Sequence, residues 1–273
     1  MHLSRDHDGT IQPRHGEPPP AAYAARAFGQ ARRDLDIDLA DADRPNLVTR
    51  LLLGGLIDLD ALPDVADRVW AWTIEERLQA LLAITVATCP APPPWQTRCQ
   101  EAACRGAMEI AIDPASFVAA PRPDLLSWRA ADGSAVTARL PNGRDLRRWH
   151  RAGVADAAAL ATPLVEAVDG RAPDPGWRVP DGWLDGLAEA FAERDPLTVL
   201  QLVAACPDCG AANRIDFDLE GWLLGLLAAE QRRLIDDVHG LTSAYHWSEA
   251  AICALPAWRR RAYLARAAAE AKS

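Results

Sequence analysis

Lysine is almost missing from this chain. Lys272 is the only lysine among 29 basic residues, and 38 acidic residues give a formal net charge of −9. Proteins that bind nucleic acid or anionic membranes over a large surface need a basic surface, because attraction to phosphate supplies much of their affinity. The charge therefore argues against such a role for the whole chain, and leaves room only for a local basic patch. The hydrophobic content of 49% is typical of a globular protein.

Long hydrophobic runs are missing as well. No stretch approaches the roughly eighteen uncharged apolar residues of a membrane-spanning helix. Residues 47–66 come closest but include Arg50, Asp58 and Asp60. The N-terminal residues lack the apolar core of a secretory signal. We therefore expect a cytoplasmic protein with reduced thiols, in which six cysteines indicate metal ligands or buried thiols before disulfides.

Motifs of catalysis are also lacking. The sequence contains no G-x-x-x-x-G-K-[ST], no G-x-G-x-x-G, no H-E-x-x-H and no G-x-S-x-G. The six histidines are scattered, and none of them is grouped with both a nucleophile and an orienting acid. The sequence therefore predicts no active site, and we expect a protein that is not an enzyme.

What the sequence does contain predicts an α+β fold that is mainly α-helical. Its parts are a flexible N-terminal arm, a first half, a helical connector, a second half with a long helix, and a C-terminal segment of helix, joint and helix. We place them at residues 1–45, 46–130, 131–192, 193–243 and 244–273. Each half is predicted to contain a cysteine pair that leads into a strand and a helix, and the C-terminal segment forms a helical hairpin.

Local signals place several of these elements. Thr73 is a suitable N-cap for a helix over residues 74–88, and residues 107–113 alternate as a strand does. Residues 133–168 read as a strand, an Asn-Gly turn and two helices. The long helix over residues 219–245 has an apolar stripe at three-, four- and seven-residue steps. The stripe consists of Leu223, Leu227, Leu234, Val238, Leu241 and Tyr245.

The cysteines carry the strongest chemical signal. Cys206 and Cys209 stand two residues apart and are followed by Gly210, which is typical of a zinc knuckle. Cys99 and Cys104 form an earlier pair with four residues between them. Cys209 lies 105 residues after Cys104, and similar residues continue in step at the same offset. We interpret this as a degenerate internal duplication.

Two similar halves packed about a pseudo-twofold axis would bring the four thiolates together. Four thiolates fill the coordination sphere of zinc, so the predicted site is structural and not catalytic. One alternative is that Cys99 and Cys104 are small core residues and that only the second pair is a relic of a knuckle. A thioredoxin-like redox role for Cys206 and Cys209 is another. Cys89 and Cys253 lie in apolar runs and are expected to be buried thiols.

The C-terminal segment combines aromatic and arginine residues. Ser248 is a good N-cap for a short helix, and Pro256 begins a second helix. Three interpretations stay open: a helix-turn-helix on DNA phosphates, a hairpin that closes its own core, or a docking hook for a partner protein. The predicted partner-binding residues are Tyr245, Trp247, Trp258, Arg259, Arg260, Arg261 and Tyr263.

This segment resembles the C-terminal signature of a family of phage baseplate proteins and their relatives in contractile injection systems. The resemblance extends over about residues 193–264 and includes the second cysteine pair. The residues that match are Val238, His239, Tyr245, Trp247, Ser248, Glu249, Ile252, Leu255, Pro256, Arg260, Arg261, Tyr263 and Leu264. The first cysteine pair departs from the knuckle pattern by its wider spacing.

The resemblance implies a setting more than a mechanism. It predicts a structural or assembly protein of a baseplate, whose partners are baseplate or tail proteins. We expect this protein in the cytoplasm or incorporated in a phage-tail-like particle. The alternative from the residues alone is a zinc-ribbon regulator, or a nucleic-acid adaptor with a helix-turn-helix-like C-terminus. Sheath, tube and baseplate genes beside this one would favour the first reading.

Overall fold

A computed structural model describes residues 2–5, 11–14, 24–57, 63–117, 125–153 and 156–270 of the chain. The fold is α+β, with 52% helix, 17% strand and only small antiparallel sheets, as the sequence predicts for its class. The helices are α1 (Arg44–Gly55), α2 (Val65–Ala71), α3 (Ile74–Thr88), α4 (Gly143–Ala152), α5 (Ala157–Ala161), α6 (Leu184–Arg194), α7 (Leu219–Tyr245), α8 (Glu249–Cys253) and α9 (Ala257–Glu270). The strands are β1 (His2–Arg5), β2 (Ile11–Arg14), β3 (Trp95–Arg98), β4 (Ala107–Ile110), β5 (Leu125–Arg129), β6 (Ala135–Arg139), β7 (Val165–Val168), β8 (Leu200–Ala205) and β9 (Ala212–Phe217).

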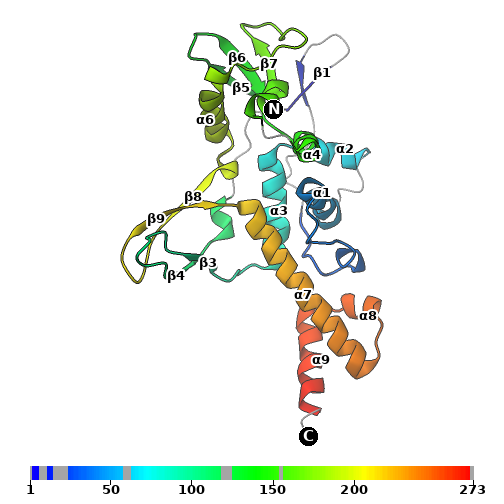
Figure 1. The fold of residues 1–273 in the computed structure, drawn as a ribbon. Helices are drawn as coiled ribbons and strands as arrows, with labels where there is room; N and C mark the ends of the chain where they lie inside the picture. The colour runs from blue at the N-terminus through cyan, green and yellow to red at the C-terminus, as the bar shows by residue number, and fades with distance from the viewer. Residues whose placement is uncertain are drawn as a thin grey trace.

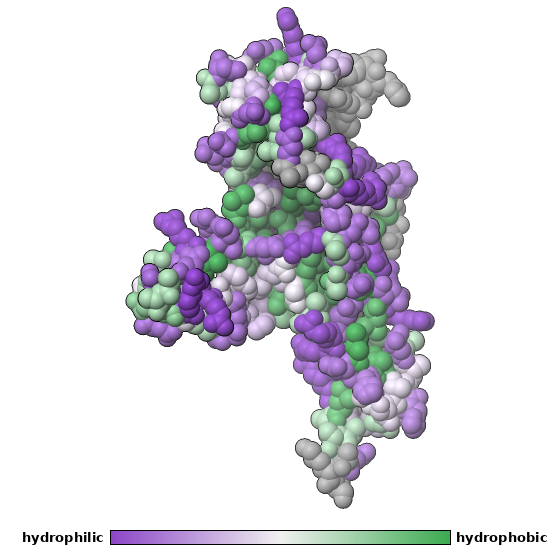
Figure 2. All heavy atoms as spheres, viewed as in Figure 1, coloured by the Kyte–Doolittle hydropathy of each residue, from purple (hydrophilic) through white to green (hydrophobic). Residues whose placement is uncertain are grey.

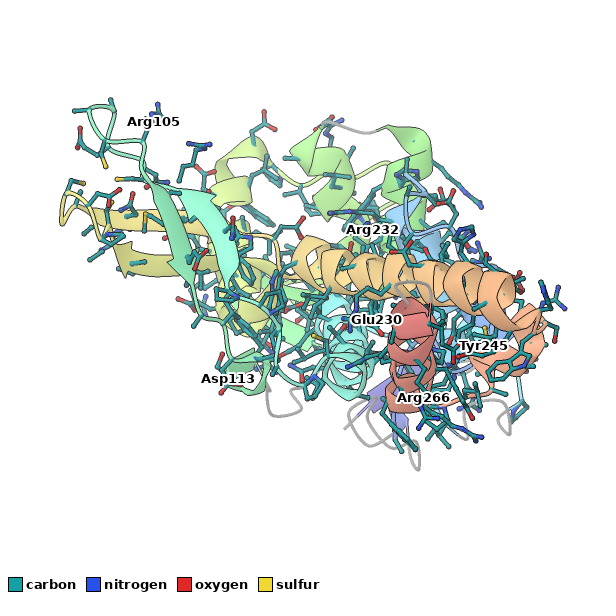
Figure 3. All side chains as sticks on the ribbon, turned by 90° about the horizontal axis from the view of Figure 1, so that it is seen from below. Arg105, Asp113, Glu230, Arg232, Tyr245 and Arg266 are labelled. Atoms are coloured by element: carbon teal, nitrogen blue, oxygen red, sulfur yellow. The ribbon has the colours of Figure 1, made fainter. Side chains whose placement is uncertain are left out.

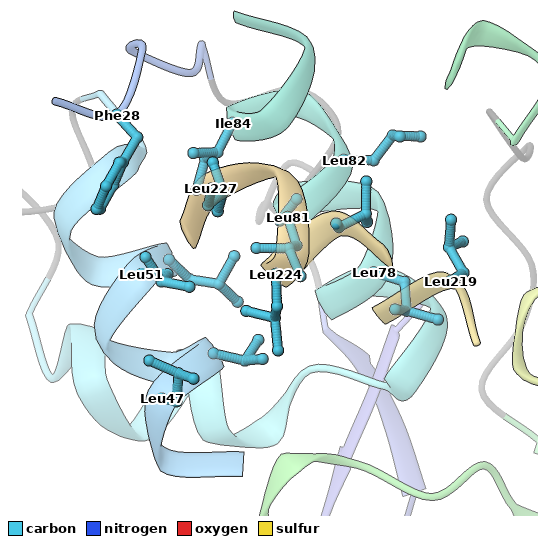
Figure 4. Packing of buried hydrophobic residues seen from close by; sticks show 14 of the residues in the cluster. Phe28, Leu47, Leu51, Leu78, Leu81, Leu82, Ile84, Leu219, Leu224 and Leu227 are labelled. Atoms are coloured by element: carbon cyan, nitrogen blue, oxygen red, sulfur yellow. The ribbon is translucent and has the colours of Figure 1, made fainter. Parts of the chain in front are cut away.

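Helices α1, α3 and α7 enclose the main core. Leu52, Leu81, Leu223 and Leu227 are fully buried there, and Figure 4 shows leucines of the three helices meeting in one cluster. Burying such a side chain stabilises the fold by about 1.5–3 kcal/mol relative to its exposure. The predicted apolar stripe of α7 is confirmed, since its four leucines are buried and Val238 and Tyr245 are half-buried.

One helix begins at the N-cap that the sequence predicts, and another begins where the sequence predicts a turn. Thr73 caps α3, and its side chain forms a capping box with Glu76. Asn142 and Gly143, which were predicted to form a turn, instead begin α4. The Asn142 side chain accepts hydrogen bonds from the amides of Arg144 and Asp145, so it is an N-cap.

The middle of the chain is a lobe with its own small core. Strands β5, β6 and β7 form an antiparallel sheet in that order, and α6 packs against it. Trp128 and Trp183 meet edge to face with their ring centroids 6.0 Å apart. Within the predicted helical connector, residues 131–192, β6 is the strand that the sequence indicates, whereas β7 is a strand at the end of a segment predicted to be a helix.

The later part of the predicted arm is packed on the body. Phe28 and Ile37 join the main core, and the buried carboxylate of Asp34 accepts hydrogen bonds from Arg26 and from the amide of Gly29. Of residues 1–23, the structure describes only β1 and β2, which pair with each other. The rest of the predicted arm, residues 1, 6–10 and 15–23, lies outside the described residues.

Two features project from this body in Figure 1. The hairpins β3–β4 and β8–β9 extend to one side, and the second half of α7 extends downward with α8 and α9. Figure 3 shows how far apart these ends lie, with Arg105 at the tip of the hairpins and Tyr245 and Arg266 on the C-terminal helices. Among the described residues, no helix combines the length and apolarity required to cross a membrane.

Candidate metal centre

The two cysteine pairs occupy matching positions in the two hairpins. In the first hairpin the amide of Cys99 donates to the carbonyl of Gly106, and in the second the amide of Cys206 donates to the carbonyl of Ala211, both at 2.9 Å. Each pair therefore starts at the end of an incoming strand and lies in the loop before the outgoing one. The first loop is two residues longer, which accommodates the wider spacing of its cysteines.

The loops bend back at equivalent residues. Arg105 and Gly210 directly follow the second cysteine of each pair and both have a positive φ, of 52° and 74°. Glycine adopts this conformation without strain, whereas arginine adopts it at a cost of about 1 kcal/mol. The positive φ at Gly210 therefore explains why the knuckle pattern in the sequence has a glycine at this position.

The four sulfur atoms converge between the hairpins. The Sγ atoms of Cys99, Cys104, Cys206 and Cys209 all lie within 4.8 Å of one another. Two contacts cross from one hairpin to the other, Cys99 to Cys209 and Cys104 to Cys206, each at 3.8 Å. A tetrahedral ion with bonds of about 2.3 Å to sulfur requires sulfur atoms about 3.8 Å apart. Two of the sulfur pairs have this spacing and all four sulfurs lie within 4.8 Å of one another, so the four cysteines form a possible four-thiolate metal site.

The same distances exclude disulfide bonds, which need sulfur atoms about 2.05 Å apart. All six cysteines fall in the described part of the chain, and all are free. Cys253 is buried outside the cluster, as the sequence predicts, whereas Cys89 is only half-buried. Burial raises the pKa of the Cys253 thiol, so it is a poor nucleophile at neutral pH.

The pKa values of Cys104, Cys206 and Cys209 are shifted in different directions. A hydrogen bond from the amide of Cys209 lowers the pKa of Cys206 to about 7, against the opposing effect of desolvation. The amide of Ala211 lowers the pKa of Cys209, but desolvation and the three neighbouring sulfurs together raise it to about 12. At Cys104 the Gly106 amide acts in the same way, and the net effect is again a raised pKa. A cation between the sulfurs would offset this mutual repulsion and favour all four thiolates.

Asn213 ties the two hairpins together beside the sulfurs, and sequence inspection missed it. Its carbonyl oxygen accepts from the amide of Gln100 at 2.6 Å, across the two hairpins. Its amide group donates to the carbonyls of Ala211 at 2.9 Å and Ala204 at 3.4 Å. The side chain is 1% exposed. The available signal was a polar residue on the inward face of β9, where the equivalent residue of β4 is Met108.

We predict that Asn213→Leu weakens metal binding by about tenfold, because hydrogen bonds next to metal ligands orient them and typically contribute 10–100-fold to affinity. The substitution removes the only described side-chain hydrogen bond that joins Gln100 to β9. Competition with a chromophoric chelator measures the affinity. Gln201→Leu on the exposed face of β8 is the matched control and should bind metal as the parent does. Equal affinities for the two variants would contradict the role of Asn213.

The predicted partner-binding residues lie together around the ends of α7 and α9. Tyr245, Trp247 and Tyr263 form a three-ring cluster with centroids 5.0–5.9 Å apart. The Tyr245 hydroxyl also donates to the carbonyl of Tyr263 at 3.2 Å. These rings stabilise the packing of α9 on α7. Trp258, by contrast, has 70% of its surface exposed.

Arg260 differs from the other predicted partner-binding residues because it is buried within the fold, which argues against a contact with a partner. Its side chain is almost fully buried, with Nε donating to Asp237 at 3.0 Å and Nη1 donating to the carbonyl of Leu255 at 2.6 Å. Arg259 and Arg261 are exposed. Consecutive residues of a helix point about 100° apart, so three arginines in a row cannot share one face.

We predict that Arg260→Ala lowers the free energy of unfolding by about 2–3 kcal/mol, because it leaves Asp237 and a carbonyl without their partner. Arg261→Ala is the matched control, and its expected effect is about 0.5 kcal/mol or less. Urea denaturation of both variants makes the comparison. If the two substitutions have the same effect, Arg260 does not anchor α9.

Comparisons of the chain with protein-family models, curated proteins and solved structures found no match. The chemical character of the site therefore rests on its own geometry: four cysteines from two hairpins form a possible metal site.

Proposed function

We propose that this protein is a non-enzymatic structural or assembly protein of a contractile, phage-tail-like baseplate, and that a structural zinc ion joins its two hairpins. The observation that carries the metal proposal is the convergence of the four sulfurs within 4.8 Å. Tetrahedral four-sulfur sites are typical of zinc or iron. A site filled by four protein ligands has no open position for substrate, which supports a structural role.

The matched hairpins also support the proposed duplication. Phe117 and Trp222, which are equivalent at the 105-residue offset, contact each other with ring centroids 6.5 Å apart. Contact between equivalent residues is expected near a pseudo-twofold axis. One departure is that the first hairpin leads into a short 3-10 helix, Pro114–Phe117, where the second leads into α7.

The baseplate setting is supported by the sequence resemblance over residues 193–264. In the structure several of its residues have roles within the fold: Ser248 caps α8, Arg260 pairs with Asp237, and the rings of Tyr245 and Tyr263 pack together. The signature therefore includes residues that hold the C-terminal projection in shape. A shaped projection from a metal-braced body is suited to joining other components.

The experiment for this function is mass spectrometry of tail-like particles and of their assembly intermediates, isolated from cells that produce them. We expect peptides of this chain in at least one of these fractions, and we expect a tagged chain to retain baseplate or tail proteins. Absence from every fraction, together with no retained tail protein, would reject the baseplate assignment.

A further inference from the structure

Helix α9 has an exposed row of residues on the face that does not contact α7, and we call this row the α9 seam. Trp258, Ala262, Ala265 and Ala269 follow one another at steps of four, three and four residues, and all four are exposed. The opposite face is anchored: Arg260 pairs with Asp237, and a side chain at Gly240 would overlap Leu264. Steps of four and three are those of the a and d positions of a coiled coil.

The charged residues on both sides of this seam are all positive. Arg259, Arg261 and Arg266 occupy the positions next to it and are exposed. They correspond to the e and g positions of a heptad, which choose the partner of a coiled coil by charge. In Figure 2 the C-terminal projection has both green apolar surface and purple hydrophilic side chains. This basic strip stands out on a chain with a net charge of −9.

We propose that the α9 seam docks an amphipathic helix of a different protein that carries acidic residues beside its own apolar seam. Small side chains at three of the four seam positions allow a second helix to approach closely, and Trp258 supplies the large anchor that interface hot spots favour. Acidic flanks on the partner would pair with the three arginines, of which Arg259 is already held by the Tyr263 hydroxyl at 3.2 Å.

A second copy of this chain is a poor occupant for the same seam. Two α9 helices placed seam to seam would set arginine against arginine in either orientation, and like charges at flanking positions are destabilising. The seam extends over about 17 Å, or roughly three helical turns. This length suits a contact that forms one part of a larger interface. The inference deepens the proposed function, on which it rests for the identity of the partner protein.

The full-length protein can be tested with two synthetic helical peptides of about four heptads. Both have Leu and Ala at the seam, and one has Glu and the other Lys at every flanking position. We expect calorimetry at low salt to show at least about tenfold tighter binding of the Glu peptide. Trp258→Ala should weaken this binding by about tenfold without changing the melting temperature. Arg259→Glu with Arg261→Glu should reverse the preference between peptides.

The matched control is Arg151→Glu with Arg171→Glu, two exposed arginines outside the C-terminal projection, and it should leave both affinities unchanged. Equal binding of the two peptides would overturn the proposal, and so would unfolding of the Trp258→Ala variant. Binding of a DNA duplex that the arginine variant abolishes, or self-association that Trp258→Ala abolishes, would assign the seam to a different occupant and also overturn it. The peptides contain no baseplate component, so the baseplate assignment can fail while this result stands.

Discussion

Cys206→Ser is expected to release the metal and to destabilise the protein severely. The residue contributes one of four sulfurs, is 2% exposed and contacts Cys104 across the two hairpins at 3.8 Å. Metal binding that occurs only in the folded state is folding free energy, so its loss is a loss of stability. We expect at least about 3 kcal/mol, which corresponds to roughly 10 °C in melting temperature for a chain of this size.

Cys89→Ser is the matched control, because Cys89 is a half-buried free thiol outside the cluster. The parent and this control should each contain one zinc ion per chain by elemental analysis, and Cys206→Ser should contain much less. Hydrogen exchange should show loss of protection centred on the two hairpins. A parent protein without metal, or a Cys206→Ser variant as stable as the control, would contradict the proposed site. Iron in place of zinc would reject the assignment of the ion while leaving the ligands intact.

Much of the candidate site could be predicted because cysteine spacing carries chemical information. Cys99 and Cys206 are separated by more than a hundred residues, and spacing alone does not bring them together. The constant offset of 105 residues indicated how they could meet, since it implied two similar units, each a cysteine pair leading into a strand and a helix, packed about a pseudo-twofold axis. Asn213 could not be found in this way, because the other hairpin has Met108 at the equivalent position and no shared pattern marks the polar clamp.

The errors in the predicted secondary structure also have local causes. An Asn-Gly pair favours both a hairpin turn and a helix N-cap, because the asparagine side chain can accept from amides in either setting. Tertiary contacts select the cap at Asn142. The four residues of β7 contain Ala and Glu, which are good helix formers, and only pairing with β6 makes them a strand. By contrast, α3 and α7 are long and periodic, and their bounds follow from the sequence.

Arg77 is a buried cation that no sequence pattern identified. It is 2% exposed, and its guanidinium joins α3 to the two helices before it. One terminal nitrogen donates to the carbonyl of Val69 at 3.1 Å, and the other donates to the carbonyl of Pro45 and the hydroxyl of Thr49, both at 2.9 Å. Desolvation lowers its pKa to about 10, against the attraction of Glu220, so it remains charged at neutral pH.

Two opposing effects decide what Arg77→Met does. The substitution removes a desolvated charge, which favours the variant, but it also removes three hydrogen bonds to buried acceptors, of which the Pro45 carbonyl still accepts from the Thr49 hydroxyl. Each unpaired buried acceptor costs about 1–3 kcal/mol, so the second effect should win. We expect the free energy of unfolding to fall by about 3 kcal/mol and the melting temperature by roughly 10 °C.

The matched control is Arg147→Met. Arg77 and Arg147 both lie over the ring of Trp70, at 5.2 Å and 4.4 Å from its centroid. Arg147 is only half-buried, however, and has no comparable set of buried acceptors among its described contacts. Its expected cost is about 0.5 kcal/mol. The loss of stability caused by Thr49→Val should fall between the two. This substitution removes one acceptor of Arg77 and leaves its hydrogen bonds to the carbonyls of Val69 and Pro45 in place. If Arg77→Met unfolds at the same urea concentration as Arg147→Met, the guanidinium is not what holds α1 and α2 on α3, and their shared leucine core is sufficient.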